Sequence, residues 1–173
     1  MTITINGSGT ITGITAGGLP DATIQQADLA ANVAGNGPAF LVTISAIQTI
    51  SANTWTKLTF NSESFDTNSN FDPTTNYRFT PTVAGYYQLN AQVQFLGSGI
   101  NANMGIYKNG SLLILGCTTP TGGGAASQVQ TVAVLLQANG STDYFEIYGF
   151  SGGTQINAGL SGANFSGFLA RAN

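Results

Sequence analysis

The sequence contains no histidine and a single cysteine, and each shortage excludes a definite kind of chemistry. Without histidine the chain cannot build a Ser-His-Asp or Cys-His nucleophilic site, and it lacks the commonest protein ligand of transition metals. Because Cys117 stands alone, no intrachain disulfide can form and the fold does not depend on an oxidising compartment. An enzyme built from this sequence would have to work with carboxylates.

Charged residues are also scarce, since four basic and seven acidic residues give a formal net charge of −3. The basic residues stand singly and cannot form the phosphate-neutralising stripe that nucleic acid requires, so we expect no nucleic-acid partner. The hydrophobic fraction of 42% is too high for a disordered chain. With so few charges for solubility, part of the apolar surface should be covered by other subunits.

Long apolar runs are missing as well. No stretch of 18 apolar residues occurs, and Met1 leads directly into Thr2-Ile3-Thr4 without the basic and apolar regions of a secretion signal. We therefore expect that the protein does not insert into a membrane. We expect it to be made in the cytoplasm of the host cell.

The acidic residues offer no clear catalytic or metal site. Glu63, Asp66 and Asp72 are close in sequence, but three nearby acids in a turn-rich segment do not define the carboxylate pair of a glycosidase. Residues 66–72 resemble a calcium-binding loop in their alternating oxygen ligands, yet Phe71 stands where such a loop needs glycine and Tyr77 where it needs glutamate. We expect no enzymatic activity, no cofactor and no metal site.

What the sequence does contain is a series of short strand-like segments separated by turn residues. In the clearest one, which follows Gly85, one face carries Tyr87, Leu89, Val93 and Phe95, and the other face is rich in glutamine and asparagine. Tyr87 should therefore be a core residue. Strands are expected at residues 39–44, 56–60, 77–80, 85–95, 103–108, 111–115, 127–137, 142–150, 155–160 and 164–170, which predicts an all-β fold.

Two Asn-Gly pairs punctuate this series, at Asn109-Gly110 and at Asn139-Gly140. Asparagine and glycine tolerate the left-handed backbone conformation that a type I′ hairpin turn requires at both central positions. Each pair therefore predicts a tight hairpin.

The order and near-spacing of six residues resemble the signature of C1q-like domains, the globular heads of the C1q and tumour-necrosis-factor superfamily: Phe60, Asp66, Phe71, Phe79, Gly85 and Tyr87. The segment IYKNGSLL at 106–113 is similar to the family's central hairpin, and NFSGFLARAN at 164–173 is similar to its closing strand. The resemblance covers most of residues 38–173. It implies a ten-stranded jelly-roll β-sandwich that assembles as a homotrimer.

Residues 1–37 differ in composition from the remainder. Isoleucines and threonines alternate near the start, as in an extended ribbon that cannot bury its apolar face alone, and a short helix is predicted near Asp28. The segment is either a flexible tail or an intertwined stem or docking segment. It resembles the Gly/Thr/Ile-rich segments that precede receptor-binding heads in bacteriophage fibre proteins.

The turn-rich residues 35–38 form the expected linker, so we divide the chain into an N-terminal docking or stem segment, residues 1–37, and a C1q-like head, residues 38–173. The head is of a suitable length for one sandwich.

Two of the expected strands are apolar on both faces. Tyr144, Tyr148 and Phe150 lie opposite other apolar residues of the strand at 142–150, and Phe168 lies opposite the other apolar residues of the last strand. The alternatives are an outer face covered within one chain and packing at a threefold axis. We favour the second, with all four residues at the trimer interface.

Polar, glycine-rich loops are the expected receptor surface, because their side chains do not have to pack in the core. Hydroxyl and amide groups suit carbohydrate ligands, and trimerisation would multiply weak affinities. The candidate receptor-binding residues are Ser98, Asn101, Thr118, Thr119, Thr121, Ser151 and Thr154.

Three functions agree with these features. The leading hypothesis is a bacteriophage virion fibre or spike protein that binds other virion proteins through its N-terminal segment and a host-surface glycan or protein through its trimeric head. The second is a structural virion decoration or trimerisation cap without a receptor. The third, a depolymerase acting on host glycans, is disfavoured by the missing acid pair.

Overall fold

The computed structural model describes residues 4–5, 11–12, 35–97, 101–116, 127–153 and 155–173, and every regular element within them is a β-strand. The chain divides into two compact units, Met1–Ala30 and Ala31–Asn173. The first contains the antiparallel pair β1 (Thr4–Ile5) and β2 (Ile11–Thr12). The boundary at residues 37/38 stays a prediction, and the helix expected near Asp28 lies outside the described residues.

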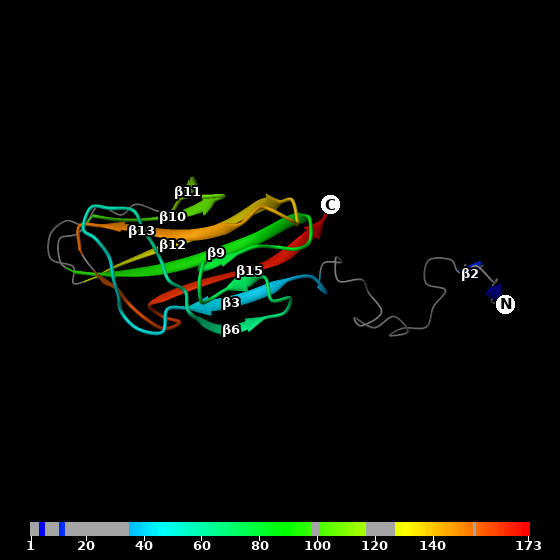
Figure 1. The fold of residues 1–173 in the computed structure, drawn as a ribbon, viewed down its shortest axis with the longest axis horizontal. Helices are drawn as coiled ribbons and strands as arrows, with labels where there is room; N and C mark the ends of the chain where they lie inside the picture. Colours follow the sequence, from blue (N-terminus) through cyan, green and yellow to red (C-terminus); the bar gives the residue numbers. More distant parts are fainter. Residues whose placement is uncertain (1–3, 6–10, 13–34, 98–100, 117–126, 154) are drawn as a thin grey trace. The chain divides into compact units, whose positions relative to one another are not determined.

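The second unit contains two antiparallel sheets that face each other as a jelly-roll sandwich (Figure 1). The seven-stranded sheet runs in the order β4 (Gln48–Thr49), β14 (Gln155–Ile156), β9 (Gly85–Leu96), β15 (Ala163–Ala172), β3 (Ala39–Thr43) and β6 (Ser62–Asp66), and β12 (Ser127–Ala138) pairs with β9.

The six-stranded sheet runs in the order β11 (Ser111–Leu115), β10 (Ala102–Lys108), β13 (Phe145–Ser151), β8 (Arg78–Phe79) and β7 (Phe71–Asp72), and β5 (Thr56–Lys57) pairs with β13. The all-β sandwich expected from the sequence is confirmed. The described residues form more strands than the ten expected, because several of them are only two residues long.

Strand β6 has no clear sequence signal, since four of its five residues are polar or acidic. It is a strand because it pairs with β3, where Phe65 lies opposite Leu41. Neighbouring backbone groups that need hydrogen-bond partners can thus impose strand structure on a segment of low β propensity.

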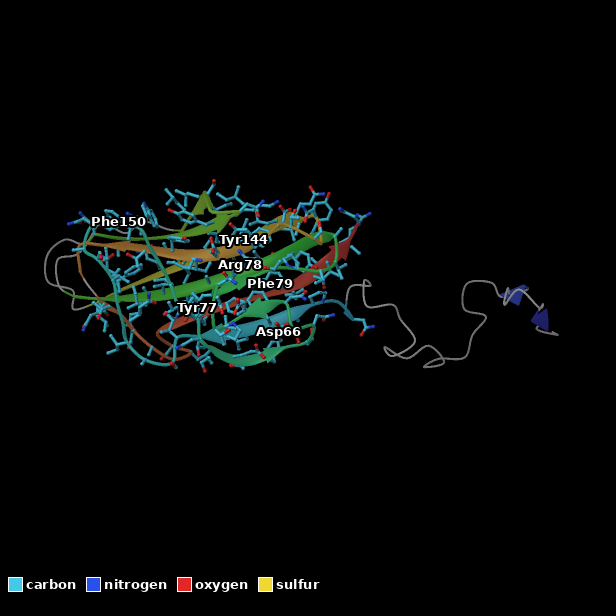
Figure 2. All side chains as sticks on the ribbon, in the orientation of Figure 1. Asp66, Tyr77, Arg78, Phe79, Tyr144 and Phe150 are labelled. Atoms are coloured by element: carbon cyan, nitrogen blue, oxygen red, sulfur yellow. The ribbon has the colours of Figure 1, made fainter. Side chains whose placement is uncertain are left out.

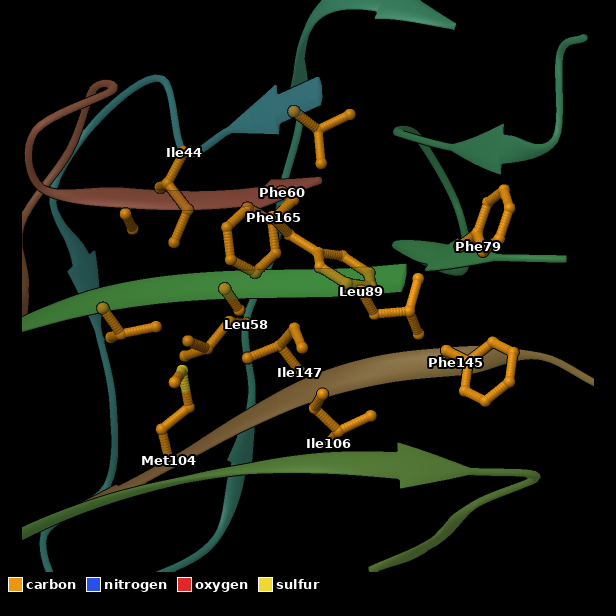
Figure 3. Packing of buried hydrophobic residues seen from close by; sticks show 14 of the residues in the cluster. Ile44, Leu58, Phe60, Phe79, Leu89, Met104, Ile106, Phe145, Ile147 and Phe165 are labelled. Carbon is orange, nitrogen blue, oxygen red and sulfur yellow. The ribbon is translucent and has the colours of Figure 1, made fainter. Parts of the chain in front are cut away.

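The core lies between the sheets and contains the inward face of β9, whose Tyr87, Leu89, Val93 and Phe95 are all fully buried. This confirms the face predicted from the alternation of the sequence. Figure 3 shows Leu89 and Ile147 in the space between β9 and β13. Aromatic rings fill one end of the core, where the ring of Phe79 packs edge-on against that of Tyr87 at 5.5 Å.

Gly167 is required where β15 crosses the core. A Cβ atom there would lie 2.5 Å from Cδ2 of Leu89 and 2.9 Å from Cε1 of Phe40. Both neighbours are buried in the core, so a side chain at this position would force them to shift, and glycine lets the core approach this strand closely.

The two Asn-Gly pairs behave differently. Asn109 and Gly110 have φ values of 54° and 78°, which confirms the tight hairpin between β10 and β11. At the second pair only Gly140 has a positive φ, so the hairpin predicted there is wrong. The side-chain oxygen of Asn139 instead accepts hydrogen bonds from the N–H groups of the following residues and shapes a wider turn.

Asp143 joins this turn to the β10–β11 hairpin. Its carboxylate accepts hydrogen bonds from the Asn109 side chain at 2.8 Å and the Asn139 N–H at 3.0 Å, and it pairs with Lys108 Nζ at 2.9 Å. Burial alone would raise the pKa of Asp143, but the hydrogen bonds from Asn109, Lys108 and Asn139 outweigh burial and lower it.

The first prediction concerns Tyr87, whose ring fills the core and whose hydroxyl donates to the Val83 carbonyl at 2.8 Å. Tyr87→Ala should reduce the free energy of unfolding by about 3–5 kcal/mol, because it leaves a large cavity. Tyr87→Phe should cost only about 1 kcal/mol, the net value of one hydrogen bond. Urea denaturation measures both, and equal losses for the two variants would contradict the assignment.

The second prediction concerns acid stability. Because the folded pKa of Asp143 lies below the ordinary value of 3.8, its contribution to stability is complete above about pH 4 and is lost as the pH falls through the folded pKa. Asp143→Asn should reduce the free energy of unfolding at pH 7 by about 1.5–3 kcal/mol and by less at pH 3. The exposed Glu63→Gln variant serves as the control. An equal loss at both pH values would contradict the role of the carboxylate.

Candidate self-association surface

The outer face of the seven-stranded sheet carries a band of amides in its middle. Gln88 donates to the Asn90 side chain at 3.2 Å, and Gln92 donates to the Ser161 carbonyl at 2.8 Å. The Gln94 side chain accepts from that of Asn157 at 2.7 Å. These amides already have partners within the chain, so covering the face by another molecule would leave fewer polar groups unsatisfied.

Beside this band lies a group of outward apolar side chains that we call the apolar face: Leu41, Phe65, Tyr86, Leu135 and Phe168. Phe65 and Phe168 are 48% and 49% exposed. Their strands, β6 and β15, both pair with β3, so the two rings lie on the same surface of the sheet. They line a shallow hollow of about 320 Å³ together with Leu41 and the backbone around Gly167. A partner side chain could enter this hollow.

A second hollow of about 440 Å³ opens farther across the same sheet. Tyr86 and Leu135, which point outward from β9 and β12, line it with Arg171 and the end of the chain. Leu135 is 53% exposed. Hollows bordered by exposed large apolar side chains are typical of a surface that another protein covers.

A different apolar surface lies along β11, an edge strand of the six-stranded sheet, and we call it the apolar edge: Leu112, Leu113 and Leu115. All three side chains are exposed. Among the described residues β11 pairs only with β10, and Gly116 at its end lies beside the Thr131 carbonyl of β12. The chain thus exposes two distinct apolar surfaces, which is what a head-to-tail ring of identical subunits requires.

A family model described as the C1q domain matches residues 39–170. The chain belongs to the C1q domain family. The match begins at the first residue of β3 and ends within β15, so the C1q domain covers nearly the whole sandwich. No protein in the curated collection of sequences matches the chain.

Solved structures agree in fold with this C1q domain. The globular domain of zebrafish complement 1qA protein aligns with a TM-score of 0.59 at 22% identity and covers 79% of this chain and 99% of its own. Eiger TNF from S. frugiperda aligns with a TM-score of 0.60 at 10% identity, covering 79% and 96%. Murine APRIL at pH 8.0 aligns with a TM-score of 0.57 at 10% identity, covering 76% and 98%.

The four residues predicted for the trimer interface lie on opposite sides of the C1q domain. Phe168 belongs to the apolar face, but Tyr148 and Phe150 point outward from β13 in the other sheet, and Tyr144 immediately precedes that strand. Figure 2 shows Tyr144 and Phe150 on that side. One flat contact cannot contain all four, and a ring of subunits that uses both sides of the domain stays a prediction. Strand parity identifies an outward residue but does not show which sheet it belongs to.

The predicted receptor residues have different outcomes. Ser98, Thr118, Thr119, Thr121 and Thr154 lie outside the described residues. Asn101 is exposed, and its carbonyl accepts the Gly152 N–H at 3.1 Å, so the segments before β10 and after β13 meet.

Ser151 is fully buried, and its hydroxyl accepts the Gly153 N–H at 2.9 Å. It shares the core-facing parity of Phe145 and Ile147 on β13, so it supports a turn and cannot contact a receptor. Its selection from the sequence is corrected, because β13 extends one residue beyond the predicted strand into the segment that was read as a loop.

The acidic segment 66–72 forms two turns. The Asp66 carboxylate accepts the N–H groups of Asn68 and Phe71, and that of Asp72 accepts the N–H groups of Thr74, Thr75 and Asn76. Hydrogen bonds from the N–H groups of Thr75 and Thr74 hold the pKa of Asp72 well below its ordinary range. These carboxylates therefore stabilise the backbone of their own turns.

Within the described parts of the chain, no group of three or more histidine, cysteine or acidic residues is placed to hold a metal ion. In the same residues no helix is long and apolar enough to cross a membrane.

The third prediction tests the apolar face. If it packs against the apolar edge of a neighbour, Phe168→Ser and Leu115→Ser should each shift the mass measured by light scattering from trimer toward monomer, because each exposes a polar hydroxyl to a partner's apolar surface. Leu160→Ser is the matched control, since Leu160 is 60% exposed but belongs to neither surface. Unchanged mass for both variants would place the interface elsewhere.

Proposed function

We propose that this chain is a fibre or spike protein of a bacteriophage particle, in which a homotrimeric C1q domain attaches the particle to glycans on the host surface. The observation that carries the proposal is the pair of unlike apolar surfaces, the apolar face and the apolar edge. Domains of the C1q and TNF family form homotrimers, which supports the same assembly here. A trimer presents three equal binding sites in one direction, as an adhesive head requires.

The first unit supports attachment to a particle. Strands β1 and β2 are two residues long and carry Ile5 and Ile11 opposite each other. A two-stranded ribbon of this size is not stable in water by itself, so other copies or other virion proteins should cover it. The resemblance of residues 1–37 to the segments that precede phage receptor-binding heads agrees with this role.

Binding rather than catalysis agrees with the charges of the C1q domain. Domains of this family are generally not enzymes. Lys57 pairs with Glu146, and Lys108 pairs with Asp143, so four of the few charged groups neutralise one another. The carboxylates of Asp66 and Asp72 hold turns. The domain is made in the host cytoplasm and acts in the virion, where it meets its receptor through many modest hydrogen bonds.

The fourth prediction tests this function with the isolated C1q domain, residues 38–173, and with the full chain. Antibody against the domain should label fibre or spike projections in electron micrographs of particles. The truncated chain should still be a folded trimer but should not enter particles, because it lacks residues 1–37. In excess, it should compete with intact particles for host cells only at high concentration, since each site is weak.

The outcomes separate the alternatives. Labelled particles without competition by the domain would indicate a structural decoration or trimerisation cap, and release of oligosaccharide from host glycans would indicate a depolymerase. An unfolded truncated chain would show that the N-terminal segment belongs to the core. Absence of label from particles would overturn the virion assignment.

A further inference from the structure

Four aromatic rings gather on the outer face of the six-stranded sheet, and we call them the aromatic platform: Trp55, Tyr107, Tyr148 and Phe150. The rings of Tyr107 and Tyr148 stack with their centres 4.0 Å apart and their planes 24° from parallel. The Trp55 ring lies 5.6 Å from that of Phe150 and 6.1 Å from that of Tyr107. Every ring contacts another, so the platform is continuous.

Strand pairing holds the rings in place. Tyr148 and Phe150 alternate with core residues along β13, and Tyr107 points outward from the neighbouring β10. Thr56 of β5 pairs with Gly149, which brings the preceding Trp55 next to Phe150. Rigid strands that fix ring positions reduce the entropy lost on binding a ligand.

The platform remains open to solvent in part. All four side chains are half-buried, so ring surface is still accessible. It lies on the opposite side of the sandwich from the apolar face. In the trimer proposed above, neighbours cover both the apolar face and the apolar edge. The edge adjoins the platform at Leu112, which pairs with Tyr107, whereas Trp55 and Phe150 lie farther from β11 and are left available for a ligand.

An unsatisfied polar atom lies in the same place. Asn103 of β10 pairs with Phe150, and its side-chain oxygen is buried without a hydrogen-bond partner among the described residues. A buried acceptor without a donor costs free energy. Asn103 as a whole is only half-buried, so rotation of its side chain would bring the oxygen to the surface beside the rings, where a ligand hydroxyl would donate to it and recover that cost. The hydroxyls of Tyr107 and Tyr148 add polar groups beside the rings.

The charged side chains near the platform already have partners within the chain. Lys57, which pairs with Tyr148 across the strands, forms an ion pair with Glu146 and donates to the Asn76 carbonyl. The Arg78 guanidinium lies 4.2 Å from the centre of the Tyr144 ring. A ligand of this surface would meet aromatic rings and neutral polar groups rather than free charge, which favours a neutral ligand.

We propose that the aromatic platform binds a neutral sugar of the host glycan. The apolar C–H face of a pyranose ring stacks on the aromatic rings, and a sugar hydroxyl donates a hydrogen bond to the side-chain oxygen of Asn103. A purely apolar protein segment could stack on the rings but would not satisfy Asn103. This inference rests on the glycan adhesion proposed above and moves its site from the loops to a sheet face.

The test uses the full chain on an array of neutral and acidic oligosaccharides of hexoses, deoxyhexoses and N-acetylhexosamines. We expect binding to at least one neutral member, with no loss at raised salt. Trp55 is the single tryptophan of the chain, so titration with the bound oligosaccharide should change the tryptophan fluorescence. The fluorescence therefore reports occupation of the platform itself.

Variants separate recognition from folding. Trp55→Ala should weaken binding by about tenfold or more, and Trp55→Phe, which keeps a ring, by less. Asn103→Ala should weaken binding while leaving the melting temperature unchanged or raised, because it removes a buried acceptor that has no partner among the described residues. A merely structural Asn103 would give the opposite result, a lower melting temperature with unchanged binding. Leu160→Ala should change neither.

Three results would overturn the inference. They are binding to no oligosaccharide on the array, binding without a fluorescence change, and equal affinity of Trp55→Ala and the unaltered chain. If the triple variant Thr118→Ala, Thr119→Ala, Thr121→Ala alone loses binding, glycan adhesion stands and the platform is wrong. If the unaltered chain binds no oligosaccharide but captures an apolar peptide at Trp55, both the platform and the proposed glycan adhesion are wrong.

Discussion

Two sheets can share one core only when alternate side chains of each strand point inward, and this period of two governs the rest of the molecule. On β9 every second residue from Gly85 to Phe95 is buried, and the aromatic residues of β3, β8 and β15 complete the same layer. Because position 167 is a glycine, there is room beside β15 for the side chains of Leu89 and Phe40. Once the inward positions are occupied in this way, each remaining side chain of a strand must point outward.

The side chains that point outward from the strands are therefore the ones available for contacts with other molecules. On the seven-stranded sheet they form a band of amides satisfied within the chain and an apolar face with two hollows. On the six-stranded sheet they form an aromatic platform beside Asn103, whose side-chain oxygen has no hydrogen-bond partner among the described residues. The first arrangement suits a partner that is itself apolar, and the second suits a small neutral molecule with hydroxyl groups. The sandwich can thus assemble through one side and bind through the other.

The charged side chains discussed above stabilise turns and strands of the fold. Asp72 holds its own turn, and Asp143 ties the turn before β13 to the β10–β11 hairpin. The Lys57–Glu146 pair lies on the outer face of the six-stranded sheet. Because these groups neutralise one another or bind backbone N–H groups, the surface is left to amides, hydroxyls and rings. A chain with so little free charge depends on covered apolar surface for solubility, which is consistent with an assembled state.

The sequence by itself determined the all-β class, the inward face of β9 with Tyr87, and the Asn109-Gly110 turn, because alternation and left-handed turn residues are local signals. It resembled the C1q domain closely enough to predict the sandwich. It did not reveal β6, and it misread Ser151 as a loop residue and Asn139-Gly140 as a tight hairpin. Only the tertiary structure decided that Phe168 lies on one sheet and Tyr148 and Phe150 on the other. It also brought Trp55 to Phe150 and placed beside them the Asn103 side-chain oxygen, which has no hydrogen-bond partner in the described part of the chain. Parity along a strand is local, whereas the sheet to which a strand belongs depends on pairing between segments far apart in the chain.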